Sequence, residues 1–332
     1  MTAMTKFKPP SLKGKVAIVT GGNRGMGFHI VQQLANHGAK VYMASRSESA
    51  AAAAISQIEA ENPELDGKGS VVFLHLDLST VAGAQNAAER FLQLESKADI
   101  LVHNAALMSH PYGKTTDGLE DTLAVNHFAP FAFTRTLLPL LISTSKQPSS
   151  DVRVITVSSA IHARAPPGGR FLSISEVNET LASAQSTDGL FGRYARYARS
   201  KLANILFAKG LQKEFDSASS PALSIAVNPG GVATETVMNN MGSVTLIGPV
   251  LRFLVGNLAS SPLDGAAAAL YAATSPDIRH QAAKFKGAYL DPHGKISQPN
   301  KDGQSEELVA NLWAASDDIT TQILSRHLSQ SP

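Results

Sequence analysis

The sequence predicts an α/β fold, a doubly wound parallel sheet with helices on both faces. Three observations predict it. Short apolar runs typical of buried strands alternate with longer helical stretches through most of the 332 residues. The first run, 16–20, breaks into glycines that lead into a helical pattern, as in a βα unit. Polar residues follow several of the later runs. No internal repeat is found, and we expect one domain over 1–332.

Each expected element has its own signal. We expect strands where β-branched and aromatic residues form short runs, and helices where apolar residues recur every three or four positions. The expected strands are 16–20, 40–45, 71–76, 100–103, 152–158, 223–228 and 288–290. A first helix is expected around apolar positions 30, 31, 34 and 35, and further helices at 50–61, 81–97, 123–143, 197–215 and 265–274.

Four segments lie outside this alternation. A short polar tail covers 1–13, and a C-terminal extension covers 291–332. Segment 160–192 is rich in Pro, Gly, Ser and Arg, which predicts an extended surface insertion. Segment 232–262 mixes large apolar residues with Gly, Asn and Ser. We expect this last segment to form a mobile, partly helical flap over the substrate.

Composition excludes several classes of function. The formal charge is only +2 and the basic residues are scattered, so nucleic-acid binding has little support. The absence of cysteine excludes disulfides and thiolate sites and suits a reducing compartment. The histidines lack metal-ligand spacing, so no metal is expected. No apolar run reaches the roughly 18 residues of a membrane span, and residues 1–14 lack the apolar core of a signal peptide. We expect a cytoplasmic protein; a homodimer stays open.

A glycine-rich turn, Thr20-Gly21-x-x-x-Gly25-x-Gly27, joins the first strand to its helix. Glycines let the backbone approach a pyrophosphate, and the N–H groups at a helix N-terminus attract its charge. The spacing differs from the commoner Gly-x-Gly-x-x-Gly, and an ordinary turn is the alternative. The expected cofactor contacts here are Thr20, Gly21, Asn23, Arg24, Gly25, Met26 and Gly27.

The end of the second strand bears on the choice between NAD(H) and NADP(H). An acidic residue there would bind a ribose 2′-hydroxyl, while an arginine accommodates a 2′-phosphate. This chain has Ser45 and Arg46, with Arg24 in the glycine turn as a second candidate. A guanidinium suits phosphate because it donates parallel hydrogen bonds. These residues favour NADP(H), although both arginines could simply be solvated.

Polar residues follow the later strands, and parallel sheets bind ligands beyond their carboxyl ends. They predict a site at one edge of the sheet. The alternative is that they cap helices or end strands. The residues are Asp77, Asn104-Ala105-Ala106, Ser158-Ser159 and Asn228-Pro229-Gly230, together with Asn126 in the long helix before the fifth strand.

Tyr197 and Lys201 are four residues apart in an expected helix and therefore lie one turn apart on one face. A lysine ammonium near a phenol favours the phenolate, so we expect it to lower the pKa of Tyr197 from about 10. Such a tyrosine can exchange a proton with an alcohol or carbonyl oxygen. The alternative is an amphipathic surface helix.

Taken together, these motifs resemble the classical short-chain dehydrogenases/reductases, which have a Rossmann fold. The resemblance runs from about Leu12 to Leu290 and rests on six motifs in order: the glycine turn, Asn104-Ala105-Ala106, Asn126, Ser158-Ser159, Tyr197-x-x-x-Lys201 and Pro229-Gly230. Three further patterns resemble the branch that holds retinol dehydrogenases and protochlorophyllide reductases. They are 200–207, Leu312-Trp313 and 287–292.

The resemblance implies a role for each matching residue. Tyr197 would be the general acid/base, and Lys201 would lower its pKa and hold the nicotinamide ribose. Ser159, rather than Ser158, would bind the substrate oxygen, and Asn126 would hold a water in a proton relay. The implied cofactor contacts outside the glycine turn are Ser45, Arg46, Asp77, Leu78, Asn104, Ala105, Ala106, Tyr197, Lys201, Pro229, Gly230, Val232 and Thr234.

The sequence thus predicts an NADP(H)-dependent oxidoreductase that interconverts a carbonyl and an alcohol. Apolar residues of the 232–262 flap suggest a lipophilic or aromatic substrate. The alternatives are reduction of a carbon–carbon double bond, a non-catalytic NADP(H)-sensing protein, and a protein held on membranes by the flap. Arg193, Arg196 and Arg199 flank Tyr197; we expect a solvated helix face, with recognition of an acidic substrate as the alternative.

Overall fold

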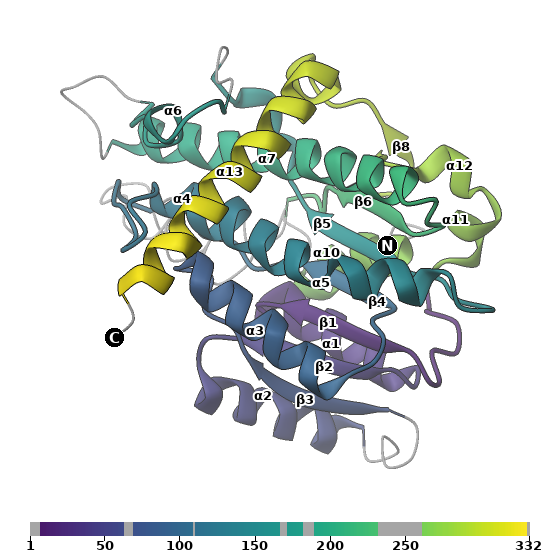
Figure 1. Cartoon of the computed structure of the whole chain (residues 1–332). Helices are drawn as coiled ribbons and strands as arrows, with labels where there is room; N and C mark the ends of the chain where they lie inside the picture. The colour runs from purple at the N-terminus through teal and green to yellow at the C-terminus, as the bar shows by residue number, and fades with distance from the viewer. Residues whose placement is uncertain are drawn as a thin grey trace, which may run out of the picture.

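An eight-stranded sheet lies at the centre of the computed structural model, which describes residues 7–62, 69–108, 110–166, 171–181, 189–231 and 261–330 (Figure 1). The strand order is β3-β2-β1-β4-β5-β6-β7-β8; β1 to β7 are parallel and β8 is antiparallel to β7. The expected α/β sheet is confirmed. The strands are β1 (Val16–Thr20), β2 (Lys40–Ser45), β3 (Ser70–His75), β4 (Ile100–His103), β5 (Arg153–Val157), β6 (Leu223–Val227), β7 (Tyr289–Leu290) and β8 (Ile296–Ser297).

Helices cover both faces of the sheet. One face packs against α1 (Gly25–Asn36), α2 (Glu48–Glu61) and α10 (Pro262–Thr274), and the other against α3 (Val81–Leu94), α5 (Ala129–Ser145) and α7 (Leu190–Ser217). The C-terminal helix α13 (Glu306–Gln330) crosses the outside of α7, α5 and α3 (Figure 1).

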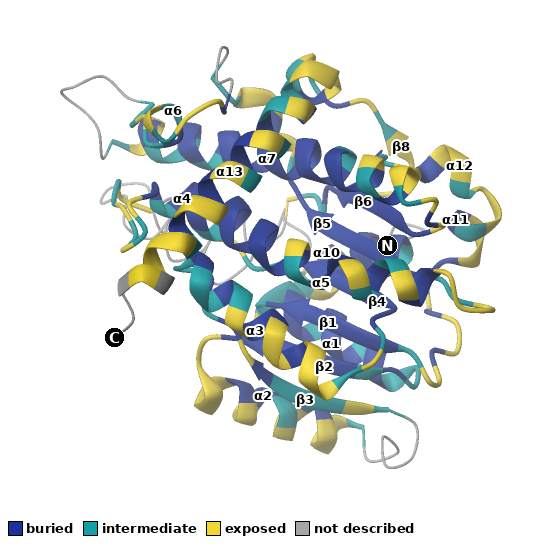
Figure 2. Ribbon diagram, in the orientation of Figure 1, coloured by how far each residue is buried: buried dark blue, intermediate teal, exposed yellow. Residues whose placement is uncertain are grey.

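Side chains of the central strands alternate between two hydrophobic clusters, one on each face. Ile18 and Leu101 belong to the cluster under α3, α5 and α7, while Val19 and Val102 belong to the cluster under α1 and α10. Both faces are buried, as Figure 2 shows for the strands at the centre. A parallel sheet buried on both faces needs continuous apolar runs, which explains why β1 to β7 were predicted to within a residue or two. The short antiparallel strand β8 was missed, and its residues are not buried.

Two expected helices differ from the observed ones. α7 begins at Leu190, seven residues before the expected start at 197. Its first turns bury Gly192, Ala195 and Arg196 instead of large apolar residues, so they carry no apolar period. The helix expected at 123–143 consists of α4 (Asp121–Leu123), a π turn η3 (Ala124–Phe128) and α5. Asn126 lies within that π turn; such turns are frequent at functional sites.

The C-terminal extension and the insertion also hold structure that was not expected. α13 was missed, although Val309, Leu312, Ser316, Ile319 and Ile323 recur at helical spacing and are buried. The described parts of the insertion contain a 3₁₀ turn η4 (Ala160–Arg164) and a short helix α6 (Ile174–Val177).

Phe171 and Val177 of the insertion are buried, so this segment is not wholly at the surface. Residues 232–260 of the expected flap lie outside the described residues. Across the described ranges, no helix is long and apolar enough to cross a bilayer.

Candidate active site

A cavity of about 620 Å³ lies beyond the carboxyl ends of the strands. This is the edge where open α/β sheets bind ligands, and the volume is in the range of small-molecule and cofactor sites. Segments after β1 to β6 and the side of α7 line it. The lining includes these expected residues: Gly21, Asn23, Arg24, Gly25, Met26, Ser45, Arg46, Asp77, Leu78, Asn104, Ala105, Ala106, Ser159, Tyr197, Lys201, Pro229 and Gly230.

The glycine turn has the geometry of a phosphate cradle. Gly21 and Gly25 adopt φ of +64° and +57°, a backbone region that favours glycine, and Gly25 has open space where a side chain would project. A Cβ on Gly27 would overlap the carbonyl oxygen of Gly21 and come within 2.6 Å of Asn104 Nδ2. α1 starts at Gly25, and no side chain caps its N-terminus. These features fit the pyrophosphate of a dinucleotide.

Thr20 is an expected cofactor residue with a different observed role. It does not line the cavity. Its Oγ1 accepts hydrogen bonds from the backbone N–H groups of Asn104 and Ala105, both at 3.0 Å. Asn104 Nδ2 in turn donates to the carbonyl oxygens of Thr20 (3.0 Å) and Gly21 (3.3 Å). Thr20 therefore joins β1 to the segment after β4 and positions residues that do line the cavity.

Asn104 Oδ1 is buried without a hydrogen-bond partner among the described residues. A buried acceptor left unpaired costs free energy, so each such group calls for an explanation. Asn104 lines the cavity, and a donor on a bound cofactor would satisfy this oxygen. The observation supports the expectation that Asn104 serves the cofactor.

The second strand ends in a basic part of the cavity. Arg24 and Arg46 are exposed, and neither guanidinium pairs with a carboxylate or hydrogen-bonds within the described part of the chain. Ser45 is buried at the end of β2. Asp77 follows β3, and its Oδ1 accepts a hydrogen bond from the backbone N–H of Ser79 at 2.9 Å. This arrangement leaves two cations available to a phosphate.

Tyr197 and Lys201 share a face of α7, as predicted. Lys201 Nζ lies 5.5 Å from the centre of the Tyr197 ring and donates to the carbonyl oxygen of Val157 at 2.8 Å. Burial lowers the pKa of Lys201 to about 7. Burial also raises the pKa of Tyr197, and the charge of Tyr194 adds to that. The expected lowering of the Tyr197 pKa is therefore wrong in sign, because desolvation by burial dominates at this position.

The structure distinguishes the two serines after β5. Ser158 is buried, and its Oγ donates to the carbonyl oxygen of Lys201 at 2.7 Å. Ser159 is partly exposed in the cavity and caps η4, where its Oγ accepts a bond from Ile161 N at 3.3 Å. The hydrogen of that hydroxyl remains available to a ligand. His162 holds the Ser159 backbone, with Nδ1 2.8 Å from its carbonyl oxygen.

Asn126 is buried, and protein groups occupy most of its hydrogen-bonding capacity. Its Oδ1 accepts from Leu107 N at 2.6 Å. Its Nδ2 donates to the carbonyl oxygen of Leu107 and to Ser200 Oγ, both at 2.9 Å. A water held by Asn126, as the resemblance implies, would have to bind the second lone pair of Oδ1 or the backbone. The observed role is to fix the loop after β4 to α7.

Some expected residues cannot be placed, and some lining residues were missed. Val232 and Thr234 lie outside the described residues. Tyr194 was missed because α7 was expected to begin after it; on the longer helix it lies one turn before Tyr197. The other missed lining residues are mostly apolar and adjoin polar ones: Ala44, Leu76, Ser79, Leu107, Met108, Val125, Val157, Ile161 and Gly231.

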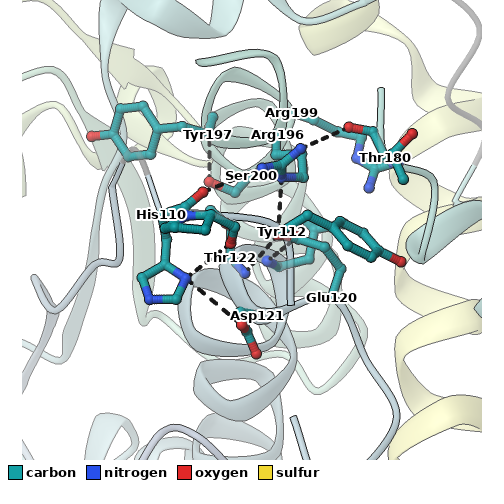
Figure 3. A network of polar contacts seen from close by, with 12 residues as sticks. His110, Tyr112, Glu120, Asp121, Thr122, Thr180, Arg196, Tyr197, Arg199 and Ser200 are labelled. Carbon is teal, nitrogen blue, oxygen red and sulfur yellow. Dashed lines mark hydrogen bonds and ion pairs between the residues drawn. The ribbon is translucent and has the colours of Figure 1, made fainter. Parts of the chain in front are cut away.

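Two of the three arginines around Tyr197 are buried, which overturns the expectation of a solvated helix face. Arg196 is 0% exposed and Arg199 is 3% exposed. The guanidinium of Arg196 donates to the carbonyl oxygens of Thr180 in the insertion and His110 in the loop after β4 (Figure 3). That of Arg199 donates to the carbonyl oxygens of Glu176 and Val177 in the insertion. Both groups are occupied by the protein itself, so they do not face an acidic substrate.

Comparisons with known proteins agree with this fold and site. The fold is a Rossmann-like α/β sheet, and a short chain dehydrogenase family profile matches residues 15–170. A short chain dehydrogenase/reductase of Colletotrichum higginsianum, dpchH, is 41% identical over 92% of this chain and 74% of its own length. One of Armillaria gallica is 38% identical over 94% of each chain.

A solved structure gives the same result. A crystal structure of an uncharacterised protein from Mycobacterium paratuberculosis has a TM-score of 0.66 and 28% identity, over 94% of this chain and 96% of that chain. The protein belongs to the short-chain dehydrogenase/reductase family. It is therefore an oxidoreductase of a family that uses nicotinamide cofactors and small-molecule substrates.

Proposed function

We propose that the protein is an NADP(H)-dependent oxidoreductase that interconverts a carbonyl and a primary or secondary alcohol on a lipophilic or aromatic substrate. One observation carries this proposal. A single cavity is lined by the glycine turn with Arg24 and Arg46, and also by Ser159, Tyr197 and Lys201. A cofactor in the glycine cradle and a substrate beside Tyr197 would therefore share one site.

The residues of this chain account for the chemistry at oxygen. A bound nicotinamide supplies or takes the hydride at carbon. The hydroxyl of Tyr197 gives a proton to the substrate oxygen, and Ser159 donates a hydrogen bond to the same oxygen. A phenol is protonated near neutral pH, so Tyr197 can give this proton when a carbonyl is reduced, and the phenolate can take it back when an alcohol is oxidised.

Two features support NADP(H) as the cofactor. β2 ends in Ser45 and Arg46, with no carboxylate to bind a ribose 2′-hydroxyl. Arg24 and Arg46 line the cavity, and each can donate charge-assisted hydrogen bonds to a 2′-phosphate. Lys201 also lines the cavity, and we assign it to the nicotinamide ribose.

The substrate end of the cavity supports an apolar substrate. Leu107, Met108, Ile161 and the ring of Tyr194 line it near Tyr197. We also propose the branch that includes retinol dehydrogenases, on the pattern at 200–207 and on Leu312-Trp313. In the structure Phe207 stacks on Trp313 with ring centres 6.0 Å apart, so these motifs join α7 to α13.

The test is a panel of lipophilic ketones and aldehydes with NADPH or NADH, followed by loss of reduced-cofactor absorbance. We expect turnover with NADPH, and none with Tyr197→Phe. If NADPH binds but no carbonyl or alcohol reacts in either direction, the proposed activity is wrong. A wild-type protein that uses NADH as well as NADPH would refute only the cofactor assignment.

A further inference from the structure

Arg196 immediately precedes Tyr197 on α7 and is fully buried. Its Nη1 donates to the carbonyl oxygen of Thr180 at 2.9 Å, and its Nη2 donates to that of His110 at 3.2 Å. Its guanidinium carbon lies 5.4 Å from the centre of the Tyr112 ring. Figure 3 shows these groups around the guanidinium. A buried charge is costly unless several groups pair with it, so this arrangement holds the side chain in one geometry.

The acidic partner of Arg196 is held equally firmly. Glu120 is fully buried, and its Oε1 lies 3.6 Å from Arg196 Nε. The two carboxylate oxygens accept the backbone N–H groups of Thr122 (2.9 Å) and Leu123 (2.8 Å) at the start of α4. The backbone N–H of Glu120 donates to Asn178 Oδ1 at 2.8 Å. The ion pair therefore joins α7, the start of α4 and the insertion.

The same network holds a wall of the cavity. The loop after β4 carries Leu107 and Met108, which line the cavity. Asn126 binds the backbone of Leu107 through two hydrogen bonds, and Arg196 binds the carbonyl oxygen of His110. Tyr112 Oη donates to the carbonyl oxygen of Asn178 at 2.9 Å, which fixes the far end of the loop to the insertion. The loop is thus attached at Leu107 itself and again beyond Met108.

We propose that Arg196 is a positioning residue that sets where Leu107 and Met108 lie relative to Tyr197 and thereby determines which substrates fit. This inference rests on the proposed function, because it assigns a determinant of specificity to the same cavity. Arg196 acts through the loop backbone and does not itself touch the substrate.

Arg199 provides a matched control on the same helix. It is 3% exposed, and it donates to the carbonyl oxygens of Glu176 (2.8 Å) and Val177 (2.6 Å). Its hydrogen bonds and ion pair in the described structure are with segment 176–179 of the insertion. The charges of Glu120, Glu176, Glu179 and Arg196 also act on it. None of these contacts is with the backbone of the loop that carries Leu107. A purely structural role of buried guanidinium groups would therefore affect both arginines alike.

The experiment compares Arg196→Lys with Arg199→Lys. Lysine keeps the charge but cannot donate the guanidinium fork to two carbonyl oxygens. We expect both variants to lower the melting temperature. We expect only Arg196→Lys to raise KM for a bulky lipophilic carbonyl, by roughly tenfold, with the NADPH Kd within about twofold of wild type. Hydrogen exchange should become faster in the peptide 105–112 in that variant alone.

Equal changes in KM for the two variants, or unchanged exchange at 105–112 in Arg196→Lys, would overturn the assignment. If Arg196→Lys does not fold, Tyr112→Phe replaces it, because it loosens the same loop by removing one hydrogen bond. We then expect a smaller rise in KM and a smaller increase in exchange at 105–112. The exchange measurement needs no substrate. If the wild type reduces no carbonyl, the proposed function fails, while faster exchange at 105–112 still identifies Arg196 as the residue that holds the loop.

Discussion

The nucleotide end and the substrate end of the cavity are built in different ways. At the nucleotide end, backbone groups of one short turn form the cradle, and four glycines within seven residues allow the close approach. At the substrate end, side chains that are distant in sequence hold the wall. Arg196 and His110 are 86 residues apart, and Asn126 and Ser200 are 74 apart. The first construction depends on local spacing, and the second on long-range packing.

Because of this difference, we expect substitutions at the two ends to affect different measured quantities. Changes in the turn should affect cofactor binding and leave substrate selection intact once cofactor is bound. Changes around α7 should affect turnover or substrate fit and leave cofactor affinity intact. Tyr197 and Lys201 lie where the two ends meet, so variants at these positions test whether turnover can be lost while cofactor affinity is kept.

The largest effect is expected for Tyr197→Phe. Loss of the proton donor should reduce turnover by roughly 10²–10⁴-fold, while the ring still fills its space. NADPH affinity, measured by fluorescence titration, should stay close to that of wild type. Tyr194→Phe is the control, because it removes a hydroxyl one helical turn away. If Tyr197→Phe kept turnover near that of wild type, the assignment of the acid would fail.

Gly27→Ala should have the opposite effect: it should weaken cofactor binding at the nucleotide end. An added Cβ overlaps the Gly21 carbonyl, so the turn must shift and the cradle distort. We expect NADPH affinity to fall by roughly hundredfold, since several charge-assisted hydrogen bonds depend on that turn. Gly231→Ala is the control, because Gly231 lines the same cavity with open space around its Cβ position. Equal NADPH affinity in the two variants would contradict the proposal that the glycine turn binds the pyrophosphate.

Arg46→Asp should change the choice of cofactor by a smaller factor. Each charge-assisted hydrogen bond to a 2′-phosphate is worth on the order of 1.5–3 kcal/mol, which is tenfold or more in affinity. We expect weaker NADPH binding and unchanged or stronger NADH binding in side-by-side titrations. Arg90→Asp, a change at an exposed arginine of α3, controls for net charge. Parallel loss of both affinities would rule out contact with the 2′-phosphate.

Lys201 should show a modest effect on stability with a defined pH dependence. Its folded-state pKa of about 7 lies below the ordinary value of 10.5, so the native state binds fewer protons than the unfolded state between these values. Wild-type stability should therefore rise with pH from about 7 toward 10.5 through this group. Lys201→Met removes that buried charge.

The Met variant should be more stable than wild type by about 1 kcal/mol or more at pH 6, and its advantage should shrink at pH 9. Urea unfolding of both proteins at the two pH values measures this. A variant less stable than wild type at pH 6 would show that the charged lysine is well solvated or paired in the native state. The effect is small beside the loss of function expected at the same position.

The sequence predicted most of the nucleotide end because its signals are local. The glycine turn directly follows strand 16–20, and Arg46 directly follows strand 40–45, so each signal lies at the end of a strand that the sequence predicts. Tyr197 and Lys201 were found for the same reason, since one helical turn separates them. The preference for Ser159 over Ser158 came from the resemblance and stays a prediction. Both serines line the cavity, but Ser158 is buried and its hydroxyl is bonded to the carbonyl oxygen of Lys201.

The substrate end could not be predicted in the same way. Burial of Arg196 depends on the carbonyl groups of Thr180 and His110, and burial of Arg199 depends on those of Glu176 and Val177. Only the tertiary fold brings these carbonyl groups near the two guanidinium groups. The sign of the Tyr197 pKa shift depends on desolvation, which no spacing reveals. The early start of α7 was missed because small residues and arginine replace apolar ones on its buried face. α13 did carry an apolar period that could have been recognised.

Transfer of deuterium to a lipophilic ketone, from NADPH that carries deuterium at both positions of nicotinamide carbon 4, tests the central claim most directly. In the proposed reaction the hydride goes to the carbonyl carbon and a proton from Tyr197 goes to the oxygen. Mass spectrometry of the alcohol should show a single deuterium at the carbinol carbon with wild type. Tyr197→Phe should bind NADPH equally well and form no labelled alcohol. Labelled product from that variant at the wild-type rate, or unlabelled product from wild type, would contradict the account.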